Sequence, residues 1–136
     1  MLRRQVGKGI NDMNYPVGDF LIQIKNAALA RKQEVDVSCT KLIRSVADEM
    51  KKMGYLDSVE EKEGRIIVKL TFHKKAPLIS KVRLVSKPGL RIYVGVGDLD
   101  KERGPSVFIV STSKGVMSSR EAIKKRLGGE VIAEVL

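Results

Sequence analysis

With 26 lysine and arginine residues against 16 aspartate and glutamate residues in 136 positions, the chain carries a formal net charge of +10, which predicts an anionic partner. One cysteine and one histidine exclude an internal disulfide and a Cys/His zinc cluster, so we expect no structural metal and no cofactor. No apolar run reaches the about 20 residues that cross a membrane, so we expect a soluble, intracellular protein without a membrane partner, cytoplasmic or, if it is encoded in an organelle, organellar.

The first half of the chain alternates between helical and strand patterns. Apolar residues at helical spacing predict an amphipathic helix over 17–28, with Asn14 as its cap. Strict alternation predicts a short strand at 34–38, and a second helical pattern follows over 42–52. Residues 55–72 form a predicted hairpin around a glycine turn, which gives the order α-β-α-β-β.

The second half is mostly strand. Charge and a proline interrupt the pattern at 73–80, so we place a first lobe at 14–75 and a second, mainly β lobe at 76–136. The fold class is therefore predicted to be α+β, with an antiparallel sheet and one short helix in the second lobe. Its predicted elements are strands at 81–86, 91–94, 106–111 and 130–135, a turn at 87–90, an exposed loop at 95–104 and a helix at 118–127.

Basic residues are concentrated in one part of the sequence. Between Gly64 and Gly97 there is no acidic residue, while this segment holds eight basic ones. Such a concentration of positive charge favours binding to a polyphosphate backbone, because each phosphate that is neutralised releases counterions. We favour a nucleic acid over a merely solvated surface, and over a membrane because the basic residues lie on predicted strands.

Catalytic patterns in the chain are weak. Ser111-Thr-Ser-Lys114 matches the S-x-x-K spacing of penicillin-binding serine enzymes, but no S-D-N or K-T-G partner occurs. No Walker phosphate loop is present, and Gly95-Val-Gly97 lacks the third glycine of a dinucleotide fingerprint. We therefore predict that the chain is not an enzyme and has no catalytic residue.

Recognition chemistry explains the run 111–115 better. Small hydroxyls at the end of a strand can bond base edges, ribose and phosphates, and the following helix could aim N–H groups at an anion. Tyr93 lies one alternation from Arg91 on the same strand face and offers a stacking platform for an unpaired base. Ser118 or Ser119 is expected to cap the helix.

Four longer motifs carry a resemblance to a known family: GDFLIQIKNA at 18–27, SKPGLRIY at 86–93, STSKGVMSSREA at 111–122 and LGGEVIAEV at 127–135. Together they resemble the bacterial family of ribosomal protein eight of the small subunit. The resemblance implies a two-lobe protein that binds a helix in the central domain of 16S ribosomal RNA and helps assemble the platform. It also implies contacts with neighbouring small-subunit ribosomal proteins and, in some relatives, with the messenger RNA of the protein's own operon.

The resemblance also implies which residues bind RNA. The run from Ser111 to Gly115 would enter a minor groove, and Glu130 would accept a bond from a base or position a neighbouring side chain. The first lobe would add backbone contacts. The residues carried over by position are Ser111, Thr112, Ser113, Lys114, Gly115, Gly129, Glu130, Tyr93, Ser86, Lys87, Pro88, Gly89, Arg91, Lys25, Asn26 and Lys41.

The chain also departs from the family pattern. The family's usual R-I-R-N is replaced by residues 23–26, Gln-Ile-Lys-Asn, so we expect weaker RNA contact from the first lobe. Residues 1–13 resemble a basic addition, with Arg3, Arg4 and Lys8, which we expect to be disordered alone and ordered against RNA or a neighbouring protein.

Two other function classes remain as alternatives. Residues 40–75 have the helix, hairpin and basic tip of a winged helix, which would make the chain a DNA-binding regulator. Against this, the strand 34–38 interrupts the expected helix-turn-helix, and Asp48 and Glu49 are unfavourable in a major groove. A serine acyl enzyme using Ser111 and Lys114 would be labelled by acyl-serine probes, and we expect no labelling.

Overall fold

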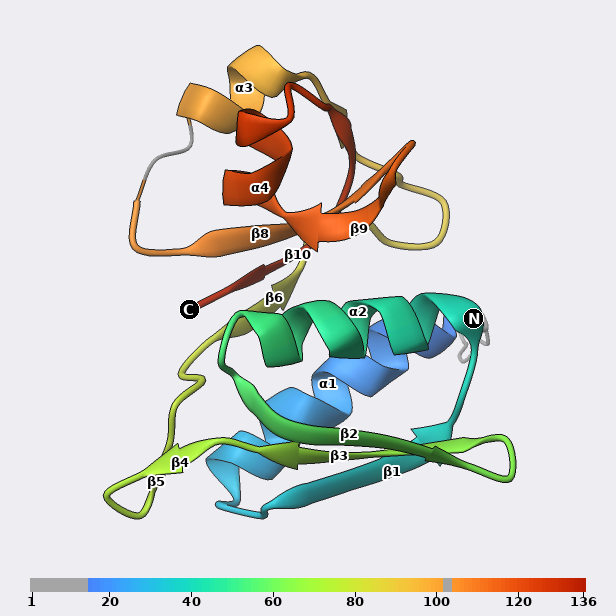
Figure 1. Ribbon diagram of the computed structural model, residues 1–136, viewed down its shortest axis with the longest axis vertical. Helices are drawn as coiled ribbons and strands as arrows, with labels where there is room; N and C mark the ends of the chain where they lie inside the picture. Colours follow the sequence, from blue (N-terminus) through green and yellow to red (C-terminus); the bar gives the residue numbers. More distant parts are fainter. Residues whose placement is uncertain (1–14, 102–103) are drawn as a thin grey trace, which may run out of the picture.

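The computed structural model describes residues 15–101 and 104–136, and it has an α+β fold of two lobes. Figure 1 shows the two lobes stacked, with a pair of helices sandwiched between two antiparallel sheets and two short helices on the far side of the second sheet. The predicted fold class is confirmed.

The first lobe contains three strands and two helices. The helices are α1, Pro16–Leu29, and α2, Lys41–Lys52. The strands β1, Glu34–Ser38, β2, Leu56–Lys62, and β3, Arg65–Leu70, form a sheet in the order β1-β3-β2. Alternate residues of β3 are buried, as period-two patterning requires, so that face of the sheet meets the helices. The predicted order α-β-α-β-β is confirmed for this lobe.

The two long helices begin in different ways. At α2 the hydroxyl of Thr40 accepts a hydrogen bond of 3.1 Å from the amide of Ile43, which satisfies one free donor of the first turn. At α1 the capping position is occupied by Tyr15, whose side chain makes no capping bond, and Pro16 follows. The predicted cap, Asn14, lies outside the described residues.

The second lobe is a five-stranded sheet with two short helices. β10, Gly129–Val135, is its central strand and pairs with β6, Val82–Leu84, with β7, Tyr93–Val94, and with β8, Val107–Thr112. β8 pairs in turn with β9, Gly115–Ser118. The helices are α3, Val96–Lys101, and α4, Ser119–Lys124.

Three sequence predictions need correction in this lobe. The predicted exposed loop at 95–104 contains helix α3, whose Leu99 is buried. The predicted helix at 118–127 ends at Lys124, and residues 115–118 form the strand β9, which was not predicted. Short segments of this kind are decided by their tertiary partners more than by local pattern.

A small hairpin joins the lobes. β4, Phe72–His73, pairs with β5, Ala76–Pro77, and the turn between them holds two lysines at positive φ, Lys74 and Lys75. This hairpin spans the expected division between residues 75 and 76, so the position of that division stays a prediction.

The two lobes share one hydrophobic core. Val107 and Ile109 of β8 are buried in the same cluster as Phe20 of α1 and Val46 of α2. The alternate residue Val110 faces the opposite way, into a second cluster with α3 and α4. The second sheet is therefore covered on both faces, by the first lobe on one side and by its own short helices on the other.

Polar contacts also cross between the lobes. A carboxylate oxygen of Glu49, on α2, accepts a bond of 3.2 Å from the amide of Ser118, and Lys52 forms a 3.0 Å ion pair with Glu121 of α4. Only 7% of Glu49 is exposed. Burial raises the pKa of Glu49, and the nearby Lys52 opposes that rise in part.

Because the core is continuous, the two lobes should unfold together. Ile109→Ala should lower the free energy of unfolding by about 2 to 5 kcal/mol, since Ile109 is fully buried at the junction. Urea unfolding followed by circular dichroism measures the loss, and amide exchange in β3 and β8 tests whether both lobes share it. Ile22→Ala is the matched control, because Ile22 is 43% exposed. Separate transitions for β3 and β8 would contradict the shared core.

The buried carboxylate predicts a pH effect of known sign. A raised pKa in the folded state means that Glu49 destabilises the fold progressively as pH rises above the ordinary glutamate pKa. Glu49→Gln keeps an acceptor for the Ser118 amide but cannot ionise. Its stability relative to wild type, from urea unfolding, should therefore improve between about pH 4 and about pH 7.

Glu121→Gln is the opposite-sign control for this experiment. Hydrogen bonds from Lys52 and Lys125 lower the pKa of Glu121, so its ionised form supports the fold at higher pH. The relative stability of Glu121→Gln should fall over the same range in which that of Glu49→Gln improves. Parallel pH profiles for the two variants would contradict the assignment.

Candidate nucleic-acid interface

The ends of three strands, β7, β10 and β8, lie side by side at one end of the second sheet. Glu130 of β10 is opposite Ser111 of β8 on one side and opposite Tyr93 of β7 on the other. Directly opposed residues in antiparallel pairs share a face, so these three form one row. We call this region the strand-end surface, and it consists of Arg91, Tyr93, residues 111–115, Gly129 and Glu130.

The turn after β8 presents two side chains without partners. The hydroxyl of Thr112 donates to the carbonyl of Gly115 at 2.8 Å and accepts from the amide of Lys114 at 3.1 Å, so it is used within the turn. Gly115 has φ +112°, which favours glycine. Ser113 and Lys114 are exposed, and neither side chain bonds any other described residue.

Gly129 is required by close packing at the strand-end surface. A Cβ atom there would collide with the carbonyl oxygen of Ser111 and lie 2.9 Å from its carbon. The neighbouring backbone of β8 cannot move away without breaking the pairing with β10. Gly129 therefore sets how closely the two strands approach, and its predicted place beside the site does not require contact with a ligand.

Arg91 and Glu130 form an ion pair of 3.1 Å on this surface. The carboxylate of Glu130 raises the pKa of the Arg91 guanidinium, which stays charged. The guanidinium also lies 5.0 Å from the ring centroid of Tyr15, and the Tyr15 hydroxyl donates to the carbonyl of Ser86 at 3.3 Å. The sequence prediction did not include Tyr15. An aromatic residue about one helical turn before a glycine, here Gly18, could have indicated that its ring packs there.

The turn at 87–90 is formed as predicted, but one of its neighbours is not a contact candidate. Ser86 is 0% exposed; its hydroxyl donates to the carbonyl of Val131 at 2.7 Å and accepts from the amide of Ile92 at 2.9 Å. The proposed direct contact of Ser86 with RNA is therefore corrected to a role in holding the turn. Lys87 and Gly89 are exposed, and Pro88 is half-buried.

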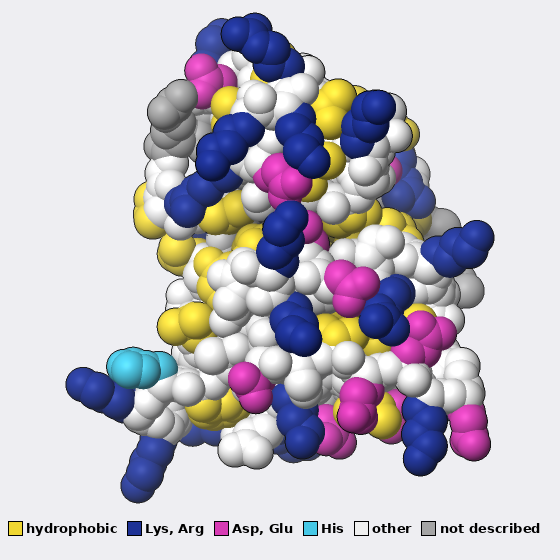
Figure 2. Space-filling view, in the orientation of Figure 1, with side chains coloured by type: hydrophobic (Ala, Val, Ile, Leu, Met, Phe, Trp, Pro, Cys, Tyr) yellow, Lys and Arg dark blue, Asp and Glu magenta, His cyan; other side chains and the backbone are white. Residues whose placement is uncertain are grey.

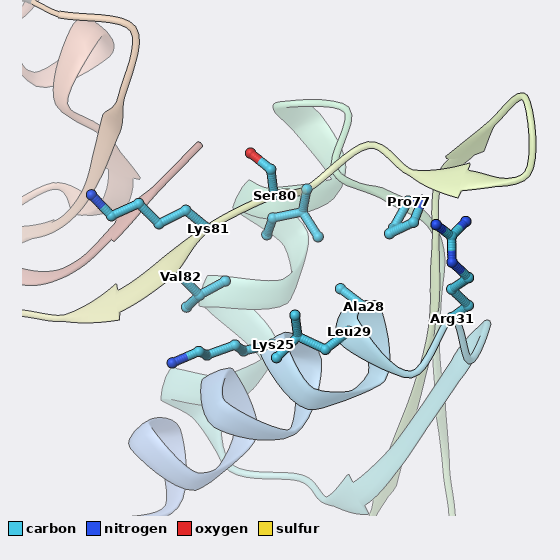
Figure 3. Close-up of a pocket in the computed structure, with 9 residues that line it drawn as sticks. Lys25, Ala28, Leu29, Arg31, Pro77, Ser80, Lys81 and Val82 are labelled. Carbon is cyan, nitrogen blue, oxygen red and sulfur yellow. The ribbon is translucent and has the colours of Figure 1, made fainter.

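The predicted contacts of the first lobe are exposed but lie elsewhere. Figure 3 shows Lys25 of α1 beside a groove that Val82 of β6 also lines. Val82 pairs with Val135, at the far end of β10 from Glu130. Asn26 borders a separate hollow with β1, and Lys41 borders another near β2. The structure therefore does not bring these three residues into the strand-end surface.

Tertiary contacts modify the basic field expected from the sequence. Arg65 pairs with Asp36 at 2.7 Å and Arg83 with Glu134 at 2.9 Å, so acids from other segments neutralise part of it. Lys87 and Lys114 form no ion pair with any described residue. In Figure 2, basic side chains are spread over both lobes, whereas most acidic ones gather on the first lobe.

The expected anion site at the start of the short helix is wrong. β9 separates α4 from the turn at 113–114, and the amide of Ser118 is already bonded to Glu49. The predicted cap is confirmed, because the Ser118 hydroxyl accepts a 3.2 Å bond from the amide of Glu121. The S-x-x-K pattern likewise spans a strand and a turn, which does not place Ser111 and Lys114 on one helix face.

The winged-helix alternative also disagrees with the structure. β1 comes between α1 and α2 in the chain and pairs with β3, so the described residues contain no helix-turn-helix there. α2 lies between the lobes with Glu49 against β9 and cannot enter a major groove. Within 15–101 and 104–136, no helix is long and apolar enough to cross a membrane, and no group of three or more His, Cys, Asp or Glu could hold a metal.

The structure is that of a two-lobe α+β protein with exposed polar side chains at its strand-end surface. Comparison with known proteins identifies the family: the model for "Ribosomal protein S8" matches residues 15–136. The chain belongs to this family, whose members are structural proteins of the ribosome and not enzymes.

Relatives from several bacteria are similar over most of the chain, and each is named small ribosomal subunit protein uS8. The relative from Methylococcus capsulatus is 43% identical over 128 residues, which is 90% of this chain and 98% of the relative. Those from Nitratidesulfovibrio vulgaris and Acaryochloris marina are each 40% identical, over 88% and 90% of this chain and over 96% and 97% of the relatives. The family resemblance found in the sequence is confirmed.

Proposed function

We propose that this chain is a primary RNA-binding protein of the small ribosomal subunit, which binds a helix in the central domain of 16S rRNA and helps assemble the platform. Family membership supports the ribosomal role. The observation that supports the location is the turn at Ser113 and Lys114, whose two exposed polar side chains have no partner among the described residues. An exposed tyrosine, Tyr93, lies in the same row of strand ends, two strands away from Ser111.

The shape of the strand-end surface suits an irregular RNA helix. A-form RNA has a wide, shallow minor groove that displays 2′-hydroxyls and base edges. A two-residue turn can approach such a groove, and the small side chain of Ser113 can donate to or accept from those groups. Tyr93 is 71% exposed, so its ring can stack on a base that an irregular helix leaves unpaired. A fully paired duplex offers no such base.

In this proposal some charged residues orient a neighbouring side chain, and others attract the phosphates of the RNA. Glu130 is paired with Arg91, so of its two expected roles we propose that it orients that neighbour. Lys87 and Lys114 supply phosphate contacts, which add affinity without selecting a sequence. Lys25, Asn26 and Lys41 would meet the RNA backbone, or a neighbouring ribosomal protein, on separate faces. A messenger RNA segment with the same irregular shape would bind the same strand-end surface.

The test compares three nucleic acids over a range of salt. Dissociation constants are measured for a hairpin carrying the central-domain site, a fully paired RNA of equal length and duplex DNA. Wild type should prefer the hairpin. Ser113→Ala should lose about 1 to 3 kcal/mol of binding to the hairpin, because its partner on the RNA is left unsatisfied. Lys87→Ala should weaken binding to all three and lower the salt slope by about one.

Matched variants on the first lobe control for surface changes in general. Ser45→Ala on α2 and Lys69→Ala on β3 alter exposed residues outside the strand-end surface and should leave the preference for the hairpin intact. Equal, salt-sensitive binding of wild type to all three nucleic acids would refute selective RNA recognition. Loss of the preference in Ser45→Ala would refute its location at the strand ends.

A further inference from the structure

Tyr15 connects the first lobe to the strand-end surface, because its ring contacts Arg91. The residue precedes α1 and is only 9% exposed, yet its ring lies 5.0 Å from the guanidinium of Arg91, whose side chain is 44% exposed. Its hydroxyl bonds the carbonyl of Ser86, which begins the segment leading to Arg91. A buried side chain of one lobe thus touches an exposed cation of the other.

Gly18 provides the space for this ring. A Cβ atom at Gly18 would collide with the Tyr15 ring, and its separation from the ring atom Cε2 would be 2.8 Å. Gly18 lies inside α1, and its φ is not positive, so the backbone conformation does not require glycine. Glycine within a helix is less favourable than alanine. The helix therefore gives up intrinsic stability at the position where the tyrosine ring packs.

Arg91 is held from two sides. The ring of Tyr15 offers its electron-rich face to the guanidinium, and the carboxylate of Glu130 binds one of its terminal nitrogens at 3.1 Å. A free arginine side chain must be ordered when it binds, which weakens binding. Holding the guanidinium before RNA arrives reduces that loss and leaves further N–H groups for a phosphate.

We propose that Tyr15 is a positioning residue of the strand-end surface, which holds Arg91 in the orientation that contacts an RNA phosphate. The proposal rests on the proposed RNA-binding function and adds to it a residue of the first lobe. Tyr15 itself does not meet the RNA. It acts through Arg91, which Glu130 also holds by an ion pair. Gly18 leaves the space in which the Tyr15 ring packs.

A double-mutant cycle tests the proposal. Dissociation constants for the central-domain hairpin are measured for wild type, Tyr15→Phe, Tyr15→Leu, Arg91→Ala and Tyr15→Leu combined with Arg91→Ala. Tyr15→Leu should weaken binding about three- to tenfold with an unchanged salt slope, and Tyr15→Phe, which keeps the ring, should stay within about twofold of wild type. Arg91→Ala should lower the salt slope, and Tyr15→Leu should then weaken binding no further.

Gly18→Ala provides an independent test of the same arrangement. It should weaken hairpin binding as Tyr15→Leu does, although alanine favours the helix, whereas Gly97→Ala in α3, where a Cβ meets nothing within 4 Å, should not. Tyr15→Leu that weakens binding equally with and without Arg91 would mean that Tyr15 serves packing only. That result, or no weakening at all, would overturn the proposal.

A measurement without RNA separates this proposal from the proposed function. The Arg91 Nε–H group should give a distinct NMR signal in wild type and Tyr15→Phe, shifted by the aromatic ring, and an averaged signal in Tyr15→Leu. If wild type shows no preference for the hairpin but this signal behaves as expected, the RNA function fails while the positioning of Arg91 stands. An averaged signal in wild type would overturn the positioning directly.

Discussion

The packing of α1 and α2 against the inner face of the second sheet is the constraint on which the rest of the structure depends. Each lobe has a size at which a single hydrophobic core gives only marginal stability. The shared cluster, which includes Ile24 of α1 and Ile132 of β10, provides one larger core for both. It also fixes the distance across which Tyr15 and Glu49 reach from the first lobe to the second. The strand-end surface is thus supported by residues outside its own lobe.

The sequence was sufficient for elements with long, regular patterns, and it failed where neighbours decide. The helix at 17–28 and the strand at 34–38 are correct within a residue or two, because their apolar residues follow a regular period. β9 has four residues and owes its pairing to β8, while α3 is held by the burial of Leu99. Motifs located the turn at 111–115. The burial of Ser86 and the place of Tyr15 depend on contacts with residues 45 and 76 positions away, which no local pattern carries.

The distribution of charge along the sequence also differs from the distribution of ion pairs in the folded structure. The segment 64–97 has no acidic residue, yet its three arginines pair with Asp36, Glu130 and Glu134 from other strands. Its lysine at 87 stays without an ion pair among the described residues. Arginine has a planar fork that carboxylates can hold in one orientation, whereas a lysine ammonium on a flexible stem acts as a point charge. In the proposed interface, the paired arginines would therefore provide fixed geometry, and the unpaired lysines would provide long-range attraction for phosphate.

A β-bulge in β10 determines on which face of the second sheet the Glu130 side chain lies. The pairing with β8 shifts between Val131 and Ala133, so one residue of β10 is extra. Ala133 packs toward the first lobe, and strict alternation would place Val131 on that face as well. The bulge sends Val131 instead to the outer cluster and places Glu130 on the inner face, beside Arg91 and the ring of Tyr15. Bulges are found where a strand must re-aim a side chain. Without this extra residue Glu130 would face α3 and α4, and Arg91 would lose its carboxylate partner.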